Sequence, residues 1–272
     1  MSNLVEVNDL RVKFVTRDRT VHAVNGVDFT LKNGEALTIL GESGSGKSVM
    51  LRSLMRLHPP KRTHITGSIR IAGQDVTAMD DEALSKMRGR TVSMIFQEPM
   101  LAFDPVFTIG RQISEAVMHH EKLDQTAAMA RALEMLERVQ IQILLLLRKL
   151  QKELGMAMIF VTHDMGVAVE IADRIAVMYA GRFIETGPVG RIIRSAQHPY
   201  TTGLLHSTVH GSMRGQRLEA IPGAPPDLAV LPSGCAFAPR CRHAHAECRD
   251  AVPPPTAIAP DHAARCFRVA AA

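Results

Sequence analysis

The segment Gly41-Glu42-Ser43-Gly44-Ser45-Gly46-Lys47-Ser48 matches the P-loop pattern G-x-x-x-x-G-K-S in a chain of 272 residues. It follows Ala36 to Leu40, an apolar run with the length of a buried strand, and precedes Val49 to Leu57, whose apolar spacing is helical. A strand, a glycine-rich loop and a helix in this order are the context that the pattern requires for binding phosphate. A glycine-rich turn that matches by chance is the alternative.

The residue types of this loop indicate how it binds a nucleotide. Backbone N–H groups of the loop and of the helix N-terminus point at phosphate oxygens. Lys47 supplies a positive charge to the β- and γ-phosphates, and the Ser48 hydroxyl is available to Mg²⁺. Gly44 and Gly46 permit positive φ and a close approach of the ligand. The nucleotide-binding residues expected from the pattern are Gly41, Glu42, Ser43, Gly44, Ser45, Gly46, Lys47 and Ser48.

The composition is that of a globular protein. Hydrophobic residues make up 46% of the chain and charged residues 22%, which excludes a disordered chain. The net charge of +5 is scattered, so it does not favour nucleic acid over a membrane-facing or phosphate-binding role. The N-terminus lacks the pattern of a signal peptide. Apolar runs such as Ile143 to Leu147 are far shorter than the roughly 18 residues of a spanning helix, so we expect a soluble chain.

Changes in composition along the chain predict two domains. Short strand patterns and turns occupy the region before the P-loop, and helical patterns dominate from Val106 to about Glu153. Proline and glycine become dense beyond His198, where all four cysteines also lie. We therefore expect an α/β core over residues 1–195, with a mixed or parallel sheet flanked by helices and an antiparallel N-terminal β part. Residues 196–272 form a small cysteine-containing extension.

Two polar residues follow apolar runs that have the character of buried strands. Gln97 follows Thr91 to Phe96, and His163 follows Met156 to Thr162. Ligands of open α/β sheets bind at the carboxyl ends of parallel strands, which is where the P-loop also begins. Either residue alone is more simply an ordinary polar residue at a strand end. Together with the P-loop they predict one shared rim.

The order of these motifs resembles that of the ABC ATPases. The P-loop is followed by Phe96-Gln97-Glu98-Pro99 and then by Val161-Thr162-His163-Asp164. The resemblance implies that Gln97 is the Q-loop glutamine, near Mg²⁺, the attacking water and the membrane-domain contact. It implies that His163 is the switch histidine at the γ-phosphate. Both are then catalytic residues, and Ser48 joins Gln97 as a magnesium ligand.

Two further features extend the resemblance over nearly the whole chain. Phe14 is placed where the family stacks the adenine ring, although a core phenylalanine is an equal alternative. His198-Pro199-Tyr200-Thr201, Pro222-Gly223 and the cysteine segment resemble the C-terminal extension of oligopeptide/dipeptide transporter subunits.

The resemblance implies an ATP-binding, energy-coupling subunit that hydrolyses ATP for peptide import, with ATP and Mg²⁺ as cofactors. Its implied partners are a second ATP-binding subunit (in a homodimer or heterodimer), two transmembrane permease subunits and, indirectly, a peptide-binding protein. Nucleic acid is not among them. The implied location is peripheral, on the cytoplasmic face of the cell (inner) membrane. Alternatives are a catalytically impaired nucleotide-binding remnant, or another P-loop NTPase or kinase; the chain has no Asn-Lys-x-Asp motif for guanine.

The chain departs from the family between Gln97 and His163. The family has an LSGGQ-type signature loop there, then a Walker B strand ending in Asp-Glu, then a D-loop. This chain has no Ser-Gly-Gly, and Leu136 to Ile141 runs directly into Gln142 to Leu147. Residues 126–154 become one helical pattern about 43 Å long without a capping signal. We interpret this as an in-frame loss of several dozen residues near 139–143; a natural compact connection is the alternative.

The four cysteines have the spacing Cys235-x5-Cys241-x6-Cys248-x17-Cys266. Four thiolates can hold Zn²⁺ or an iron–sulfur cluster. No C-x2-C zinc pair is present, and related subunits of the family carry a [4Fe–4S] cluster on this extension. Four incidental free thiols are the remaining alternative. Other candidate ligands, more simply solvated loop histidines, are His243, His245 and His262.

Overall fold

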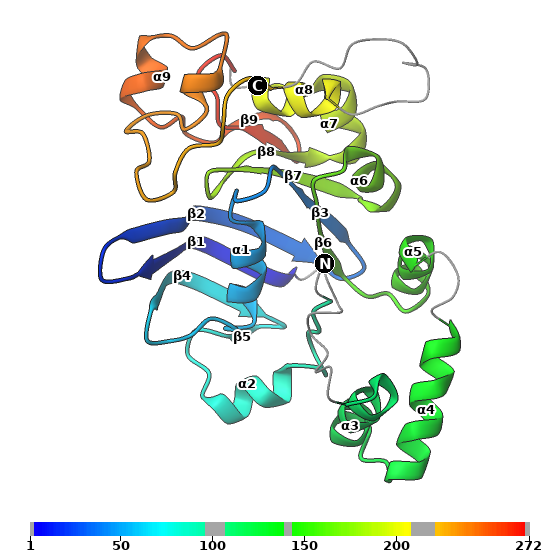
Figure 1. The fold of residues 1–272 in the computed structure, drawn as a ribbon. Helices are drawn as coiled ribbons and strands as arrows, with labels where there is room; N and C mark the ends of the chain where they lie inside the picture. Colours follow the sequence, from blue (N-terminus) through cyan, green and yellow to red (C-terminus); the bar gives the residue numbers. More distant parts are fainter. Residues whose placement is uncertain (1–2, 96–106, 139–142, 208–220, 270–272) are drawn as a thin grey trace. The chain divides into compact units, whose positions relative to one another are not determined.

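A computed structural model describes residues 3–95, 107–138, 143–207 and 221–269. The chain divides into two compact units (Figure 1). The first unit combines Met1–Thr77 with Gln151–Ala272, and the second unit is Ala78–Leu150. The first unit therefore contains the P-loop and the cysteine-containing extension together. These units are defined by how the residues pack, so they do not test the domain boundary expected between residues 195 and 196. That boundary remains a prediction.

The first sheet of the first unit is the expected antiparallel N-terminal β part. Val5, Val7, Leu10 and Val12 are all buried, since alternate side chains of a strand point to one face. The register shifts between Val7 and Leu10, which restores the buried face after a bulge. The strand order is β2-β1-β4-β5, with β1 (Asn3–Val15), β2 (Thr20–Lys32), β4 (Thr63–Ile71) and β5 (Gln74–Asp75).

The second sheet is mixed and has the order β6-β3-β7-β8-β10-β9 (Figure 1). Strand β3 pairs in parallel with β6 and β7, and the other neighbouring strands are antiparallel. The last two strands come from the C-terminal extension, which therefore extends the core sheet. The bounds are β3 (Ala36–Leu40), β6 (Met158–Thr162), β7 (Arg174–Tyr179), β8 (Arg182–Pro188), β9 (Thr256–Ala259) and β10 (His262–Ala264).

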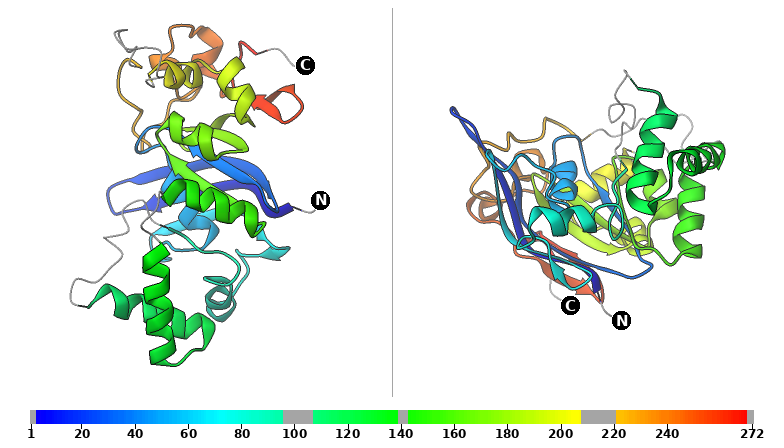
Figure 2. Two further views of the ribbon diagram at one scale, coloured as in Figure 1. Left: turned by 90° about the vertical axis from the view of Figure 1, so that its right-hand side faces the viewer. Right: turned by 90° about the horizontal axis from the view of Figure 1, so that it is seen from below.

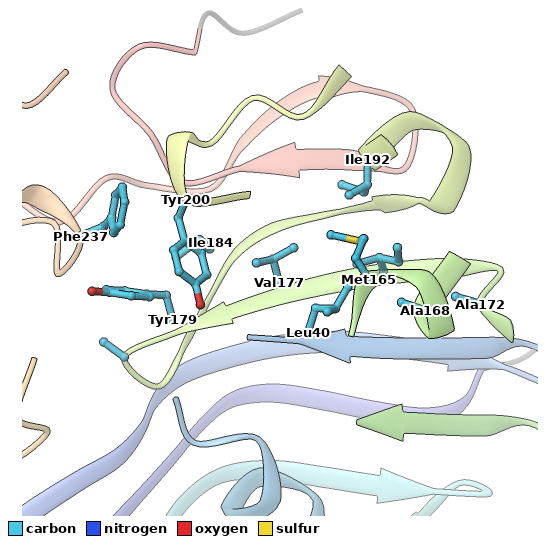
Figure 3. Close-up of a cluster of buried hydrophobic side chains, with 12 residues drawn as sticks. Leu40, Met165, Ala168, Ala172, Val177, Tyr179, Ile184, Ile192, Tyr200 and Phe237 are labelled. Atoms are coloured by element: carbon cyan, nitrogen blue, oxygen red, sulfur yellow. The ribbon is translucent and has the colours of Figure 1, made fainter. Parts of the chain in front are cut away.

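A buried cluster joins this sheet to helices that follow it (Figure 3). Leu40 and Val177 belong to the adjacent strands β3 and β7, and Met165 lies on α6 (Met165–Ile171). Tyr179, Tyr200 and Phe237 form three edge or tilted ring contacts with centroids 4.6 to 5.4 Å apart. The other helices here are α7 (Val189–Ser195), α8 (Pro199–His206), the 3-10 helix η2 (Ala238–Arg240) and α9 (Ala246–Asp250).

A buried carboxylate also ties the extension to the core. Glu185 of β8 accepts hydrogen bonds from the backbone N–H groups of Gln197 (2.8 Å) and His198 (2.9 Å). Its Oε1 lies 2.9 Å from Nε2 of His262 on β10, and both side chains are fully buried. His262 is thereby engaged in packing. Because a buried carboxylate without partners is costly, this network fixes the extension on the sheet.

The second unit consists of short helices, of which α3 and α4 pack against each other (Figure 2). Helix α2 begins after Asp80, whose side chain caps the N–H of Ala83, and Thr108 caps α3 in the same way. The pattern expected to be one helix over residues 126–154 is described as two helices, and its join at residues 139–142 lies outside the described residues. The bounds are α2 (Asp81–Met87), α3 (Ile109–Glu121), α4 (Gln125–Arg138) and α5 (Ile143–Glu153), whose residues from Gln151 onward are assigned to the first unit.

The strand expected at Thr91 to Phe96 is wrong for its described part. Residues 91–95 form no strand, and the Ile95 side chain is 74% exposed. An apolar run becomes a strand only where a neighbour offers backbone partners. Within the described part of the chain, β6 ends the six-strand order and has no neighbour beyond it. Among those same residues, no helix is long and apolar enough to cross a bilayer.

Candidate functional site

The P-loop connects β3 to α1 (Lys47–Leu54), as the pattern predicts. Gly44 and Gly46 have φ of 79° and 101°, which confirms the positive φ expected at both positions. A Cβ at Gly46 would overlap the Ala23 carbonyl oxygen, so the loop also needs glycine for space. No side chain in the described residues caps α1, so its first N–H groups face the loop. This is the arrangement that binds an anion at a helix N-terminus.

Lys47 lies across the loop. Its Nζ donates to the carbonyl oxygens of Gly41 (2.7 Å) and Glu42 (2.8 Å) and to Ser45 Oγ (3.3 Å). Burial lowers the pKa of Lys47, and the nearby Glu42 carboxylate opposes that shift. The ammonium group is therefore held over the loop by neutral oxygens, with only one carboxylate near it. Phosphate oxygens are stronger acceptors than these carbonyls, so the charge is available to a nucleotide.

His163 lies at the same sheet edge as the P-loop. Leu40, the residue before the loop, pairs in parallel with Thr162, the residue before His163. The His163 side chain is exposed, and the next residue, Asp164, caps α6 by accepting from the N–H groups of Gly166 (2.7 Å) and Val167 (3.3 Å). The edge therefore presents the imidazole of His163, while the Asp164 carboxylate is engaged by the helix.

Comparison with known proteins gives the family. Residues 24–158 match the ABC transporter family, and residues 184–248 match the oligopeptide/dipeptide transporter C-terminal region. A putative peptide import ATP-binding protein of Brucella abortus is 40% identical, with 97% of each chain covered. The oligopeptide transport ATP-binding protein OppD of Bacillus subtilis is 38% identical over 90% of this chain and 83% of its own.

The chain belongs to the ABC transporter family. It is an ATP-binding subunit of the oligopeptide/dipeptide group, an assignment that rests on both matched regions. The fold also agrees with the dimeric ATP-binding cassette MJ0796 bound to ADP and phosphate. That structure has a TM-score of 0.59 at 21% identity, with 68% of this chain and 98% of that one covered. Cassettes of this family bind ATP with Mg²⁺, dimerise, and work with transmembrane permeases.

The Brucella relative also shows by how much this chain is shorter. Its alignment runs over 327 positions, 55 more than the 272 residues of this chain. At least that many positions of the relative therefore have no counterpart here. The expected α/β cassette fold is confirmed, but with a shorter sequence than the relative uses to build it.

The remaining nucleotide-site predictions have different outcomes. Gln97 lies outside the described residues. Ser48 is exposed in the first turn of α1. Phe14 is half-buried on β1, where its ring meets His58 edge-on at 5.3 Å, and His58 Nε2 lies 2.9 Å from the Val49 carbonyl oxygen of α1. Phe14 is thus beside the P-loop helix.

The four cysteines are free thiols that line one hollow in the extension. The Cys235 N–H donates to the Cys248 carbonyl oxygen at 2.8 Å, which draws together two of the loops. Burial raises the pKa values of the Cys235 and Cys266 thiols, and neighbouring cysteines that line the same hollow raise them further. In the described ranges, no three His, Cys, Asp or Glu side chains are arranged to hold a metal ion.

Sequence reasoning missed the residues that hold the P-loop from outside. Arg240 forms an ion pair with Glu42, and the Tyr200 hydroxyl accepts a hydrogen bond from the Glu42 N–H at 2.9 Å. Both partners lie far along the sequence, on the extension. The sequence singled out His198-Pro199-Tyr200 only through its resemblance to the family. The position of Arg240 in the sequence did not predict its contact with the P-loop.

Proposed function

We propose that this cassette couples ATP binding to the import of oligopeptides or dipeptides. The observation that carries the proposal is the complete P-loop between β3 and α1, with Lys47 held over it. The match of residues 184–248 to the oligopeptide/dipeptide transporter C-terminal region supports the substrate class. In this role, the cassette acts at the cytoplasmic face of the cell (inner) membrane with a second ATP-binding subunit and two permease subunits. A peptide-binding protein delivers the substrate to the permeases.

Uptake of a labelled peptide tests this proposal in cells. A strain that lacks the gene will accumulate a radiolabelled oligopeptide or dipeptide more slowly than its parent. The reason is that the transporter has lost one of the ATP-binding subunits that drive it. The complete gene will restore uptake, and the Lys47→Ala gene will not. Uptake of a labelled free amino acid is the control. Unchanged uptake of every peptide tested, with the chain present in the parent, would contradict the proposed substrate class.

Each rim residue has a proposed role in this cassette. Ser48 and Gln97 bind Mg²⁺, Gln97 also orients the attacking water, and His163 contacts the γ-phosphate. The position of His163 beside the end of β3 supports its assignment. Phe14 stacks on the adenine ring, which its half-buried position next to α1 supports. Its edge contact with His58 leaves the alternative that Phe14 has only a packing role. Measuring the affinity of the Phe14→Leu variant for the adenine nucleotide separates the two roles.

We also propose that the chain has lost the segment that contains the signature loop and the Walker B strand. The surplus of 55 aligned positions in the Brucella relative supports this proposal. So does β6, whose sequence Met-Ile-Phe-Val-Thr has the apolar character of a strand covered on both faces, yet is only half-buried throughout. A missing neighbour explains both this exposure and the absence of a strand over residues 91–95. The alternative function is accordingly an impaired nucleotide-binding remnant.

The four cysteines are proposed to hold a [4Fe–4S] cluster, with Zn²⁺ as the alternative. The donor set fits: four thiols and no disulfide line one hollow. A cluster takes one thiolate at each of four irons, so its thiols stand wider apart than around a single zinc ion. The cluster is preferred to zinc because the related subunits of the family carry one on this extension. Its role would be to brace the loops from Cys235 to Cys266.

Metal content and colour test the cysteine site. Protein purified without oxygen will be brown and contain about four irons per chain, the content of one [4Fe–4S] cluster. Each Cys-to-Ser variant will lose colour, because one iron loses its thiolate. His243→Ala and His245→Ala are matched controls on the same loops and will stay brown. Colourless protein with one zinc per chain would select the Zn²⁺ alternative, and protein without metal would leave four incidental thiols.

A further inference from the structure

The side chain of Glu42, the second residue of the P-loop, is held by an arginine of the extension. Arg240 Nη1 lies 2.7 Å from Glu42 Oε2, and Nη2 lies 3.1 Å from Oε1. The Arg240 side chain is 5% exposed and that of Glu42 is 28% exposed. Two parallel N–H···O bonds between planar groups fix both distance and orientation. The pair is therefore well shielded from water and geometrically defined.

Arg240 is in turn fixed by its own surroundings. Its Nε donates to the Pro222 carbonyl oxygen at 2.8 Å, and Nη1 also reaches the Tyr179 hydroxyl at 3.2 Å. The neighbouring Tyr200 hydroxyl accepts from the Glu42 N–H at 2.9 Å. Figure 3 shows Tyr179 and Tyr200 side by side next to Phe237. The extension thus holds both the backbone and the side chain of one P-loop residue.

Glu42 is also where this support meets the phosphate-binding lysine. Lys47 donates to the Glu42 carbonyl oxygen at 2.8 Å, and the Glu42 carboxylate acts electrostatically on the Lys47 ammonium group. A carboxylate so near the lysine competes with phosphate for its charge unless another cation neutralises it. Arg240 is that cation, and its two bonds to the carboxylate hold it in one orientation.

We propose that Arg240 is a positioning residue for the P-loop, through which the C-terminal extension sets the affinity for MgATP. The inference rests on the proposed nucleotide binding. By holding Glu42, Arg240 keeps Lys47 available to the β- and γ-phosphates. Because η2 lies between Cys235 and Cys241, the same contact links the order of the cysteine loops to the nucleotide site. Coupling of this kind is reciprocal, so bound MgATP also stabilises those loops.

A pair of substitutions separates positioning from a purely structural role. In Arg240→Gln the freed Glu42 carboxylate competes for Lys47, and we expect the Kd for MgATP to rise about tenfold, the effect of about 1.4 kcal/mol. In the double variant Glu42→Gln with Arg240→Gln no carboxylate is left to compete. Its Kd will return to within about threefold of the parent. Arg242→Gln, a change at a nearby exposed arginine, is the control and leaves Kd unchanged.

Two further measurements keep the outcome clear. The melting temperature of each variant shows whether the fold survives, and Tyr200→Phe removes only the hydroxyl that accepts from Glu42 N–H. That variant will weaken MgATP binding by a smaller factor even if Arg240→Gln does not fold. If the parent binds MgATP and Arg240→Gln binds equally tightly, or the double variant shows no recovery, the inference is wrong. If the parent does not bind MgATP, the proposed function fails instead.

Discussion

Purified alone, this chain will hydrolyse MgATP about 100- to 10,000-fold more slowly than a full-length relative, the range that a positioned general base contributes. Phosphoryl transfer requires Mg²⁺ in place and a group that orients the attacking water. The family supplies these from the Asp-Glu pair that ends the Walker B strand, and the sequence between Gln97 and His163 contains no Asp-Glu pair. Asp164, the carboxylate next to His163, has its Oδ1 engaged in capping α6.

A chimera provides the matched control for hydrolysis. It carries the Brucella relative's segment between the glutamine and histidine motifs in place of the shortened region. We expect phosphate release to recover in the chimera and to be lost again when His163→Ala is added. Turnover by the unmodified chain at the rate of the full-length relative, itself abolished by His163→Ala, would overturn the proposal of a lost segment.

Replacing Lys47 with alanine will weaken MgATP binding about ten- to a hundredfold, which corresponds to roughly 1.5–3 kcal/mol for a charge-assisted contact. The ammonium group lies over the loop on the Gly41 and Glu42 carbonyl oxygens, from where it turns to the phosphates. Removing it leaves the backbone N–H groups as donors and takes away the positive charge beside them.

Equilibrium titration with MgATP measures this effect. The control is Lys86→Ala, which removes an exposed lysine whose ion pair with Glu82 lies on the surface of the second unit. Its Kd will equal that of the parent. Equal affinity of Lys47→Ala and the parent chain would refute the assignment of the P-loop.

Sequence patterns predicted well where the structure depends on near neighbours along the chain. The P-loop needs only a strand, glycines and a helix in succession, and β3, Gly46 and α1 meet that expectation. The position of His163 was also predictable, because parallel strands bring their carboxyl ends to one edge. The family likeness added the extension, which the comparison with known transporters confirmed.

The prediction of a strand over residues 91–95 failed because it rested on the local apolar pattern alone. Residues 91–95 have an apolar pattern, but a β-strand is stable only when its backbone groups find partners in a sheet. Apolar periodicity reports what a segment can bury, and it does not report whether the adjoining strand exists. Strand β6 likewise has the apolar sequence of a buried strand and is only half-buried in the structure.

The nucleotide-binding loop, the α/β class and the family could all be predicted from residue types at short, fixed spacings. The contact of the extension with the P-loop could be found only in the folded chain. Glu42 and Arg240 are 198 residues apart, and the identity of neither residue predicts the other. Phe237, the residue before η2, packs against Tyr179 and Tyr200, and this packing accompanies the contact between Arg240 and Glu42. Such long-range contacts come from packing, for which local spacing carries no code.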